Sequence, residues 1–223
     1  AGGARVDSMQ WLSSLNADPM PWLLEADPAN PGVRYLALTQ LLDRPADDPE
    51  VVAARQAVMA SGPVPPILTA QAGEGYWVQP GPGYYPKYRG TVWQVPEAGR
   101  TPVVRAAIQE GIRFLLGRDP AKADYPAPYA TKPSRSSFQF GYPIAYVTDV
   151  LQNLEALTAL GCGRDPRLTS ALELVLSKQD ALGRWKLEYT YNGKTWADVE
   201  EKGRPSKWVT LRALRVLKNA ARA

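Results

Sequence analysis

The sequence reads QDALGRW at residues 179–185 and QAGEGYW at residues 71–77, so both stretches share the pattern Gln-x-x-x-Gly-x-Trp. In each copy an apolar residue, Ile67 or Val175, lies four positions before the glutamine, as expected near the end of a helix. Each copy is also followed by a second tryptophan, Trp93 or Trp208, at the expected start of another helix. The chain therefore predicts a repeated unit of helix, turn, loop and helix.

Each residue type in this motif has a physical role in a sharp turn between two helices. Glycine permits the reversal of the backbone, and the glutamine side chain supplies partners to backbone groups that lack them at a helix end. We expect the indole ring to stack on that amide and to shield it from water. The residues assigned to the repeat are Gln71, Gly75, Trp77, Gln179, Gly183 and Trp185.

Helix starts are marked by pairs in which a capping residue precedes proline, because proline fits the first helical position. Apolar residues follow these pairs at helical spacing, and no alternating stretch exceeds four or five residues. We therefore expect an all-α fold, with one helix from Pro143 through Leu154 and another from Pro205 to about Ala221. The capping pairs are Asp18-Pro19, Asn30-Pro31, Asp48-Pro49, Thr101-Pro102 and Asp165-Pro166.

The composition narrows the chemistry available to the protein. With no histidine and a single cysteine, Cys162, the chain has no histidine-based nucleophile system, no histidine-ligated zinc and no internal disulfide. We therefore expect no metal and no cofactor. Such sparse cysteine use indicates a reducing, cytoplasmic location. Because nowhere do 18 apolar residues run together, we expect no transmembrane segment. Peripheral membrane contact and the oligomeric state are left open.

The net charge of +4 arises at the C-terminus, where the residues after Glu201 include seven basic side chains and no acid. On a helix, Arg212, Arg215, Lys218 and Arg222 form one stripe opposite an apolar face. One interpretation is a solvated face whose cations interact favourably with the helix dipole. The other is a phosphate-binding stripe for nucleic acid. Because no aromatic residues interleave with the stripe, we favour the solvated face and expect no nucleic-acid partner.

The repeated motif resembles the QW repeat of the squalene cyclase and protein prenyltransferase superfamily. Residues 174–185 and 205–211 in particular are similar to bacterial prenyltransferase/squalene-oxidase-repeat proteins. The resemblance extends from about Pro21 onward and is strongest after Phe138. It implies a single α/α-toroid domain over residues 1–223, in which outer helices wrap inner helices whose ends surround a central cavity.

The chain departs from that superfamily at its catalytic motifs. The cyclase motif Asp-x-Asp-Asp is absent, as are the Asp-Asp-x-x-Asp magnesium motif and the histidine of the prenyltransferase zinc site. The helix that starts near Trp93 also meets Pro96 after one turn, whereas its counterpart from Trp208 continues as far as Ala221. We therefore expect a helix pair to be missing near residues 95–96.

A first set of candidate site residues surrounds the helix expected from Pro143. On such a helix Tyr142, Tyr146, Asp149 and Asn153 share one face, opposite the apolar stripe. If this face lines the cavity, Asp149 is a lone Brønsted acid, a role that the resemblance to triterpene cyclases implies for an aspartic acid. The alternatives are that this face meets water or that Asp149 fastens a loop.

A second set lies in the loops that follow the two motif copies. Residues 188–201 combine Asp198 and Glu200 with aromatic rings, which can bind a cation, a sugar or a carbocation. The alternative is a structural connector whose acids pair with nearby basic residues. We expect equivalent loops to lie at one rim of the toroid, where Lys132, Ser134 and Arg135 add an anion site. The assigned ligand-binding residues are Tyr84, Tyr85, Lys87, Tyr88, Trp93, Tyr142, Tyr146, Asn153, Tyr189, Tyr191, Lys194, Trp196 and Trp208.

These patterns favour a terpenoid cyclase- or prenyltransferase-like protein that holds a small apolar, isoprenoid-like molecule in an aromatic-lined central cleft. If it is an enzyme, we expect acid-initiated cyclisation or isomerisation. One alternative is a non-catalytic helical-repeat scaffold for a protein partner, which predicts a cavity filled by side chains and an exposed apolar patch. Another is a carbohydrate-active toroid, which requires Asp149 to face Asp198 or Glu200 across a cleft of ~5–10 Å.

Overall fold

The computed structural model of the chain describes residues 7–73, 78, 109, 111–125, 132–144 and 148–222. No strand forms among these residues, where isolated bridges join Gly141 to Tyr189 and Lys186 to Pro205. The expected all-α class is therefore confirmed for the described part of the chain. Besides helical residues 111–116, its helices are η2 (Asp7–Ser14), α1 (Met20–Leu24), α2 (Pro31–Leu36), η3 (Ala37–Leu41), α3 (Pro49–Ala60), α4 (Val64–Thr69), η5 (Pro120–Lys122), η6 (Arg135–Phe138), α6 (Val150–Ala159), η7 (Pro166–Leu168), α7 (Thr169–Ser177) and α8 (Lys207–Arg222).

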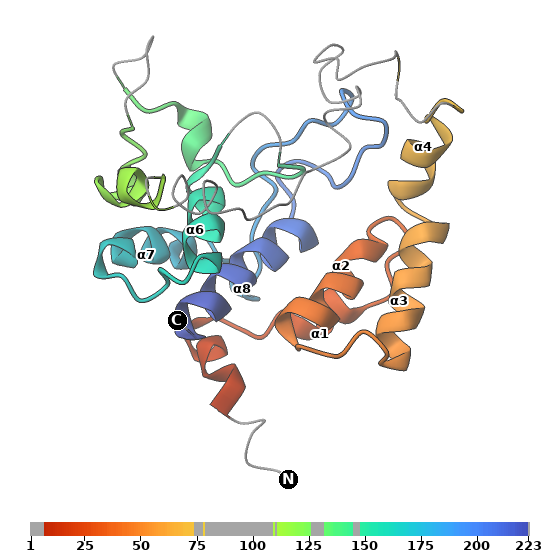
Figure 1. Cartoon of the computed structure of the whole chain (residues 1–223), viewed down its shortest axis with the longest axis horizontal. Helices are drawn as coiled ribbons and strands as arrows, with labels where there is room; N and C mark the ends of the chain where they lie inside the picture. The colour runs from red at the N-terminus through yellow and green to blue at the C-terminus, as the bar shows by residue number, and fades with distance from the viewer. Residues whose placement is uncertain are drawn as a thin grey trace.

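Helix α8 lies at the centre of the described structure. It packs against α6 on one side and against η2, η3, α1 and α2 on the other (Figure 1). Every residue from Lys207 to Leu214 is buried, although a helix enclosed in this way is normally apolar all round. The charged side chains of α8 must therefore find their partners inside the fold.

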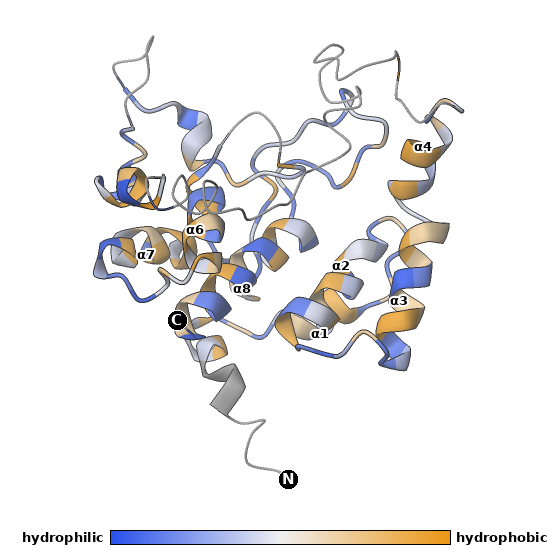
Figure 2. Cartoon of the chain, in the orientation of Figure 1, coloured by the Kyte–Doolittle hydropathy of each residue, from blue (hydrophilic) through white to orange (hydrophobic). Residues whose placement is uncertain are grey.

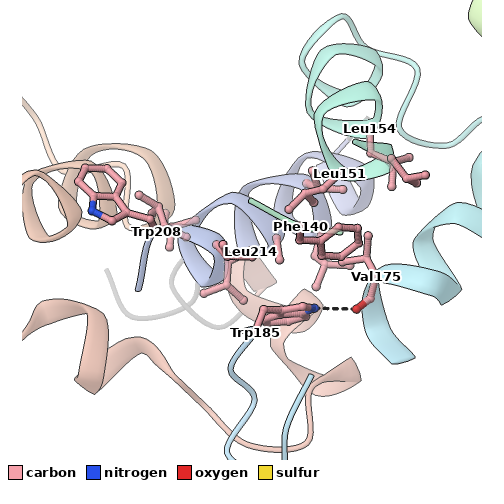
Figure 3. Close-up of a cluster of buried hydrophobic side chains, with 14 of the residues drawn as sticks. Phe140, Leu151, Leu154, Val175, Trp185, Trp208 and Leu214 are labelled. Carbon is pink, nitrogen blue, oxygen red and sulfur yellow. Dashed lines mark hydrogen bonds between the residues drawn. The ribbon is translucent and has the colours of Figure 1, made fainter. Parts of the chain in front are cut away.

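Trp185 anchors the second motif copy in the hydrophobic core between α7 and α8. Its side chain is fully buried, and its indole nitrogen donates to the Val175 carbonyl at 2.7 Å (Figure 3). Its backbone N–H donates to the Thr210 hydroxyl of α8 at 3.0 Å. Phe140 and Leu151 extend the same core toward α6. One tryptophan thus fixes the end of α7 against the central helix.

The glycine and the glutamine of this copy have the expected roles. Gly183 adopts φ +68°, and a Cβ at this position would lie only 2.1 Å from the Ala17 carbonyl oxygen. Gln179 accepts from the Asn16 N–H at 2.7 Å and donates to the Ser14 carbonyl at 3.4 Å, at the end of η2. The motif therefore joins the N-terminal segment to the end of α7.

The first motif copy can be followed only in part. Gln71 is exposed near the end of the described range 7–73, whereas Gly75 and Trp77 lie outside the described residues. Residues 95–96, where we expect a helix pair to be missing, also lie outside them. The equivalence of the two turns and the closed toroid therefore stay predictions.

Helix starts follow the local capping signals where the structure describes them. Asp48 accepts from the Glu50 N–H at 2.8 Å, and Asp165 accepts from the Arg167 N–H at 3.0 Å. The start expected at Pro143 is wrong, because α6 begins at Val150. Its N-cap residue takes extended backbone angles, which a helix running through that position does not allow. The shared helical face expected for residues 142–153 therefore does not form.

Within the described ranges, no helix has both the length and the apolar character that crossing a bilayer requires.

Candidate functional site

A pocket with a volume of about 590 Å³ opens beside the N-terminal end of α6. Its described walls come from helical residues 111–116 and the segment that follows them, from residues 132–137, and from the first residues of α6. A volume of this size is typical of small-molecule sites. No residue of α8 belongs to its described lining.

One wall of the pocket is apolar and aromatic. The ring centroids of Phe114 and Tyr125 lie 5.7 Å apart, and the Tyr125 hydroxyl donates to the Leu115 carbonyl at 3.1 Å. Burial, together with the carboxylates of Asp124 and Asp119, raises the pKa of Tyr125, so that its phenol stays neutral. Phe114 is 55% exposed, which leaves its ring accessible to a ligand. Ala123, Pro133 and Val150 complete this wall.

The rest of the lining is polar. Ser134 caps η6, because its hydroxyl accepts from the Ser136 N–H at 3.3 Å. Within the described part of the chain, four further lining side chains make no hydrogen bond or ion pair. Polar groups that converge on one pocket in this way can satisfy the polar groups of a ligand. These four side chains belong to Lys132, Ser137, Thr148 and Asn153.

Asp149 also lines the pocket, but its carboxylate is fully engaged. It caps α6 by accepting from the Gln152 N–H at 2.7 Å, and it accepts from the Gly141 N–H at 3.2 Å. The guanidinium of Arg212 donates to both of its oxygens, at 3.1 and 3.2 Å. This geometry matches the alternative in which Asp149 fastens a loop, and it gives no support to a proton donor at this position.

Two of the four stripe residues, Arg212 and Lys218, do not form the solvated face that we expected, whereas Arg215 and Arg222 are 37% and 48% exposed. The Arg212 side chain is 3% exposed and also pairs with Glu155 at 2.8 Å. Although burial alone would lower it, Asp149 and Glu155 raise the pKa of Arg212. The Lys218 side chain is 1% exposed and pairs with Asp43 at 2.7 Å. These two cations therefore face neither solvent nor phosphates, because acids from other parts of the chain enclose them.

Glu200 and Asp198 are held by backbone groups of their own loop and of α8. Glu200 accepts from the Lys207 N–H at 2.7 Å and from the Ser206 hydroxyl, and burial raises its pKa despite these bonds. Asp198 accepts from the Gly193 N–H at 2.5 Å. With Asp149 buried in an ion pair, the two free facing carboxylates required by the carbohydrate alternative are not present here.

Four of the aromatic residues predicted to line a cleft pack against other parts of the protein: Tyr142, Tyr189, Tyr191 and Trp208. Trp208 stacks on Tyr142 with ring centroids 4.3 Å apart, and its indole nitrogen donates to the Asn30 side chain at 2.7 Å. Burial raises the pKa of Tyr142 above its usual range. Tyr191 is 2% exposed and meets the edge of Tyr189 at 5.2 Å. The ring of Tyr191 in loop 188–201 is therefore packed into the fold.

The sequence located part of this pocket. Lys132 and Ser134 of the predicted anion site line it, and so do Asn153 and Asp149, whereas Arg135 does not. Lys194 is exposed and Trp196 half-buried, and neither lines the pocket. Sequence reasoning missed Phe114, Tyr125, Ser137 and Thr148. The available signal for Tyr125 and Ser137 was the long segment 118–142, which is rich in proline, tyrosine and serine. Five predicted ligand residues and Tyr146 lie outside the described residues: Tyr84, Tyr85, Lys87, Tyr88 and Trp93.

The chain matches no protein-family model, no curated protein and no solved structure at a significant level.

Proposed function

We propose that the chain is a helical-repeat protein of the prenyltransferase/squalene cyclase-like superfamily, with the helices of an α/α toroid, that binds a small apolar, isoprenoid-like molecule. The proposed site is the pocket beside α6 rather than a central cleft. The observation that carries the proposal is a volume of about 590 Å³ with an accessible phenylalanine ring on one wall. The Gln179–Trp185 turn supports the superfamily assignment, because each of its motif residues makes a specific tertiary contact.

The proposal is one of binding, without an assigned acid. Acid-initiated chemistry needs a carboxyl group that is free to release a proton to the ligand. Asp149 meets this requirement poorly, since Arg212 and two backbone N–H groups occupy its oxygens. The neutral phenol of Tyr125 donates to a backbone carbonyl. The described lining therefore supports positioning of an apolar chain more directly than it supports catalysis.

Titration of the full chain with farnesol in a calorimeter tests this proposal. Phe114→Ala removes ligand-facing apolar surface and should weaken binding roughly five- to tenfold, since burial of part of a phenylalanine ring contributes about 1 kcal/mol or more. The substitution should leave the fold intact, because the ring is 55% exposed. Met59→Ala on α3 is the matched control, because this side chain is 58% exposed and lies outside the pocket.

Two results would contradict the assignment of this site. One is the absence of farnesol binding at about 100 µM, a concentration well above the dissociation constant of an ordinary small-molecule site. The other is equal weakening by Phe114→Ala and Met59→Ala, because such a result would indicate nonspecific adsorption of farnesol to apolar surface. Glucose, which shares none of the apolar character of farnesol, serves as the negative ligand.

The scaffold alternative also stays a prediction. Helix α3 carries hydrophobic residues at several positions along its length (Figure 2), of which Val51 and Ala54 are buried. Val52, Met59 and Leu68 are 41%, 58% and 45% exposed. These are the surfaces that a protein partner would cover. The calorimetric titration separates the two functions, since a scaffold that uses α3 and α4 has no reason to bind farnesol in the pocket beside α6.

A further inference from the structure

The charge of the pocket lining indicates what the polar end of a ligand should be. Two of the described lining residues carry charge, Lys132 and Asp149. The negative charge of Asp149 is compensated by Arg212, which donates to both of its oxygens and is itself buried. Lys132 makes no ion pair within the described part of the chain. The described lining therefore has one uncompensated positive charge, that of Lys132.

Three further residues of the lining carry neutral donor groups. The hydroxyl groups of Ser137 and Thr148 and the amide of Asn153 line the pocket and, among the described residues, have no other partner. Hydroxyl and amide groups donate well to an anionic oxygen, and hydrogen bonds to a charged acceptor are stronger than those between neutral groups. Other nearby acids are engaged elsewhere, because Asp124 pairs with Arg118 and Asp119 pairs with Lys122.

One cation and a few neutral donors suit a singly charged head group better than a multiply charged one. A diphosphate carries several charges, and proteins usually hold it with several basic side chains or a metal ion. Among the described residues, no group of three acidic or cysteine side chains lies close enough to hold a metal ion. A carboxylate, by contrast, needs one positive charge and two to four donors.

We propose that the pocket binds an amphiphilic monocarboxylate, with its carboxylate at Lys132 and the neighbouring hydroxyl and amide groups, and its apolar chain against Phe114 and Tyr125. This inference rests on the proposed function, because it assigns the polar end of the ligand to the same pocket. An isoprenoid acid and a straight-chain fatty acid share this chemistry. The assignment rests on the one uncompensated lysine of a lining that also contains Phe114 and Tyr125.

Calorimetric titration of the full chain with farnesol, farnesoic acid, dodecanoic acid and farnesyl diphosphate tests the proposal. Farnesoic acid should bind about three- to tenfold more tightly than farnesol, the range for one partly exposed charge interaction with its hydrogen bonds. Lys132→Gln should remove this advantage, so that the variant binds farnesoic acid and farnesol with affinities within about twofold of each other. Lys202→Gln is the matched control, because Lys202 is also exposed and lies outside the pocket. Raising the salt concentration should weaken farnesoic acid binding and spare farnesol.

The outcomes distinguish this inference from the function on which it rests. If farnesol binds in a Phe114-dependent manner but farnesoic acid binds no more tightly, the carboxylate proposal is wrong and the apolar pocket stands. The carboxylate proposal is also wrong if Lys132→Gln still binds farnesoic acid more tightly than farnesol. It is wrong as well if farnesyl diphosphate binds more tightly than farnesoic acid. If neither ligand binds, both proposals fail. Dodecanoic acid binding as tightly as farnesoic acid supports the carboxylate site and identifies fatty acids as the source.

Discussion

Replacement of Arg212 by methionine should strongly destabilise the protein. The guanidinium is 3% exposed and donates to Asp149 and Glu155, whose side chains are 7% and 13% exposed. It also donates to the Gly141 carbonyl at 2.5 Å. Methionine retains much of the apolar volume but provides no donor. The substitution therefore leaves two acids and one carbonyl without their shared partner.

The expected loss follows from the burial of that cluster. Removal of one partner from a buried ion pair costs about 3–5 kcal/mol, because the remaining charge is left uncompensated. A domain has a total free energy of unfolding of about 5–15 kcal/mol. With a urea dependence of about 2 kcal/mol per M, the unfolding midpoint should fall by roughly 1.5–2.5 M. Asp149 retains two backbone N–H donors, which places the expected value toward the lower part of this range.

Urea unfolding followed by circular dichroism measures this loss. Arg215→Met is the matched control, because Arg215 is 37% exposed and 3.9 Å from Glu155, and it should cost less than about 0.5 kcal/mol. Arg212→Lys keeps a charge without the fork geometry and should cost an intermediate amount. The double variant with Asp149→Asn should lose less than the sum of the two single losses. A loss below about 1 kcal/mol in Arg212→Met would refute the argument from burial.

Three further changes test other parts of the fold by the same unfolding measurement. Gly183→Ala should lower the free energy of unfolding by about 2 kcal/mol or more, because the added Cβ meets backbone atoms. Gly193 has a similar positive φ but open space around it, so Gly193→Ala should cost about 1 kcal/mol. Equal costs for the two variants would contradict the close approach at Gly183. Trp185→Phe should cost about 1–3 kcal/mol through the lost buried hydrogen bond, and a change near zero would exclude that role. Burial alone would raise the pKa of Asp43, but hydrogen bonds from two cations of α8 lower it. The contribution of Asp43 to stability is therefore present above its pKa in the unfolded chain. It is lost as the pH falls through the lower pKa of Asp43 in the folded protein. Asp43→Asn should cost about 1 kcal/mol at neutral pH and progressively less below about pH 4, whereas a constant difference would refute the pairing.

The features predicted best from the sequence are those fixed by a few neighbouring residues. A carboxylate followed by proline determined the starts of α3 and η7, because capping needs a side-chain acceptor within two or three residues of the free N–H groups. The role of Gly183 in the turn could also be predicted from neighbouring residues, because the reversal of the backbone at that position needs a positive φ, which glycine adopts readily. The start of α6 was missed because the apolar residues from Pro143 onward have helical spacing, and this spacing does not show at which residue the helix begins.

The burial of the basic stripe depends on partners that are distant in sequence. Arg212 reaches Asp149 across 63 residues, and Lys218 reaches the Leu41 carbonyl across 177. Periodicity shows that polar residues share a face of α8, but it does not show whether water or buried acids lie opposite them. The same limit applies to the pocket, whose walls join residues 111–125 and 132–137 to the beginning of α6.

The charge pairing of α8 explains why the ligand should be sought beside α6. Lys207 reaches Asp27 at 3.3 Å, Arg212 reaches Asp149, and Lys218 reaches Asp43, so that each cation ties the central helix to a different part of the chain. The pocket of about 590 Å³ includes no residue of α8 in its described lining, which joins the N-terminal end of α6 to residues 114–125 and 132–137. Substitutions that loosen α8 should therefore lower stability throughout, whereas substitutions in the pocket wall should change binding and leave stability nearly unchanged.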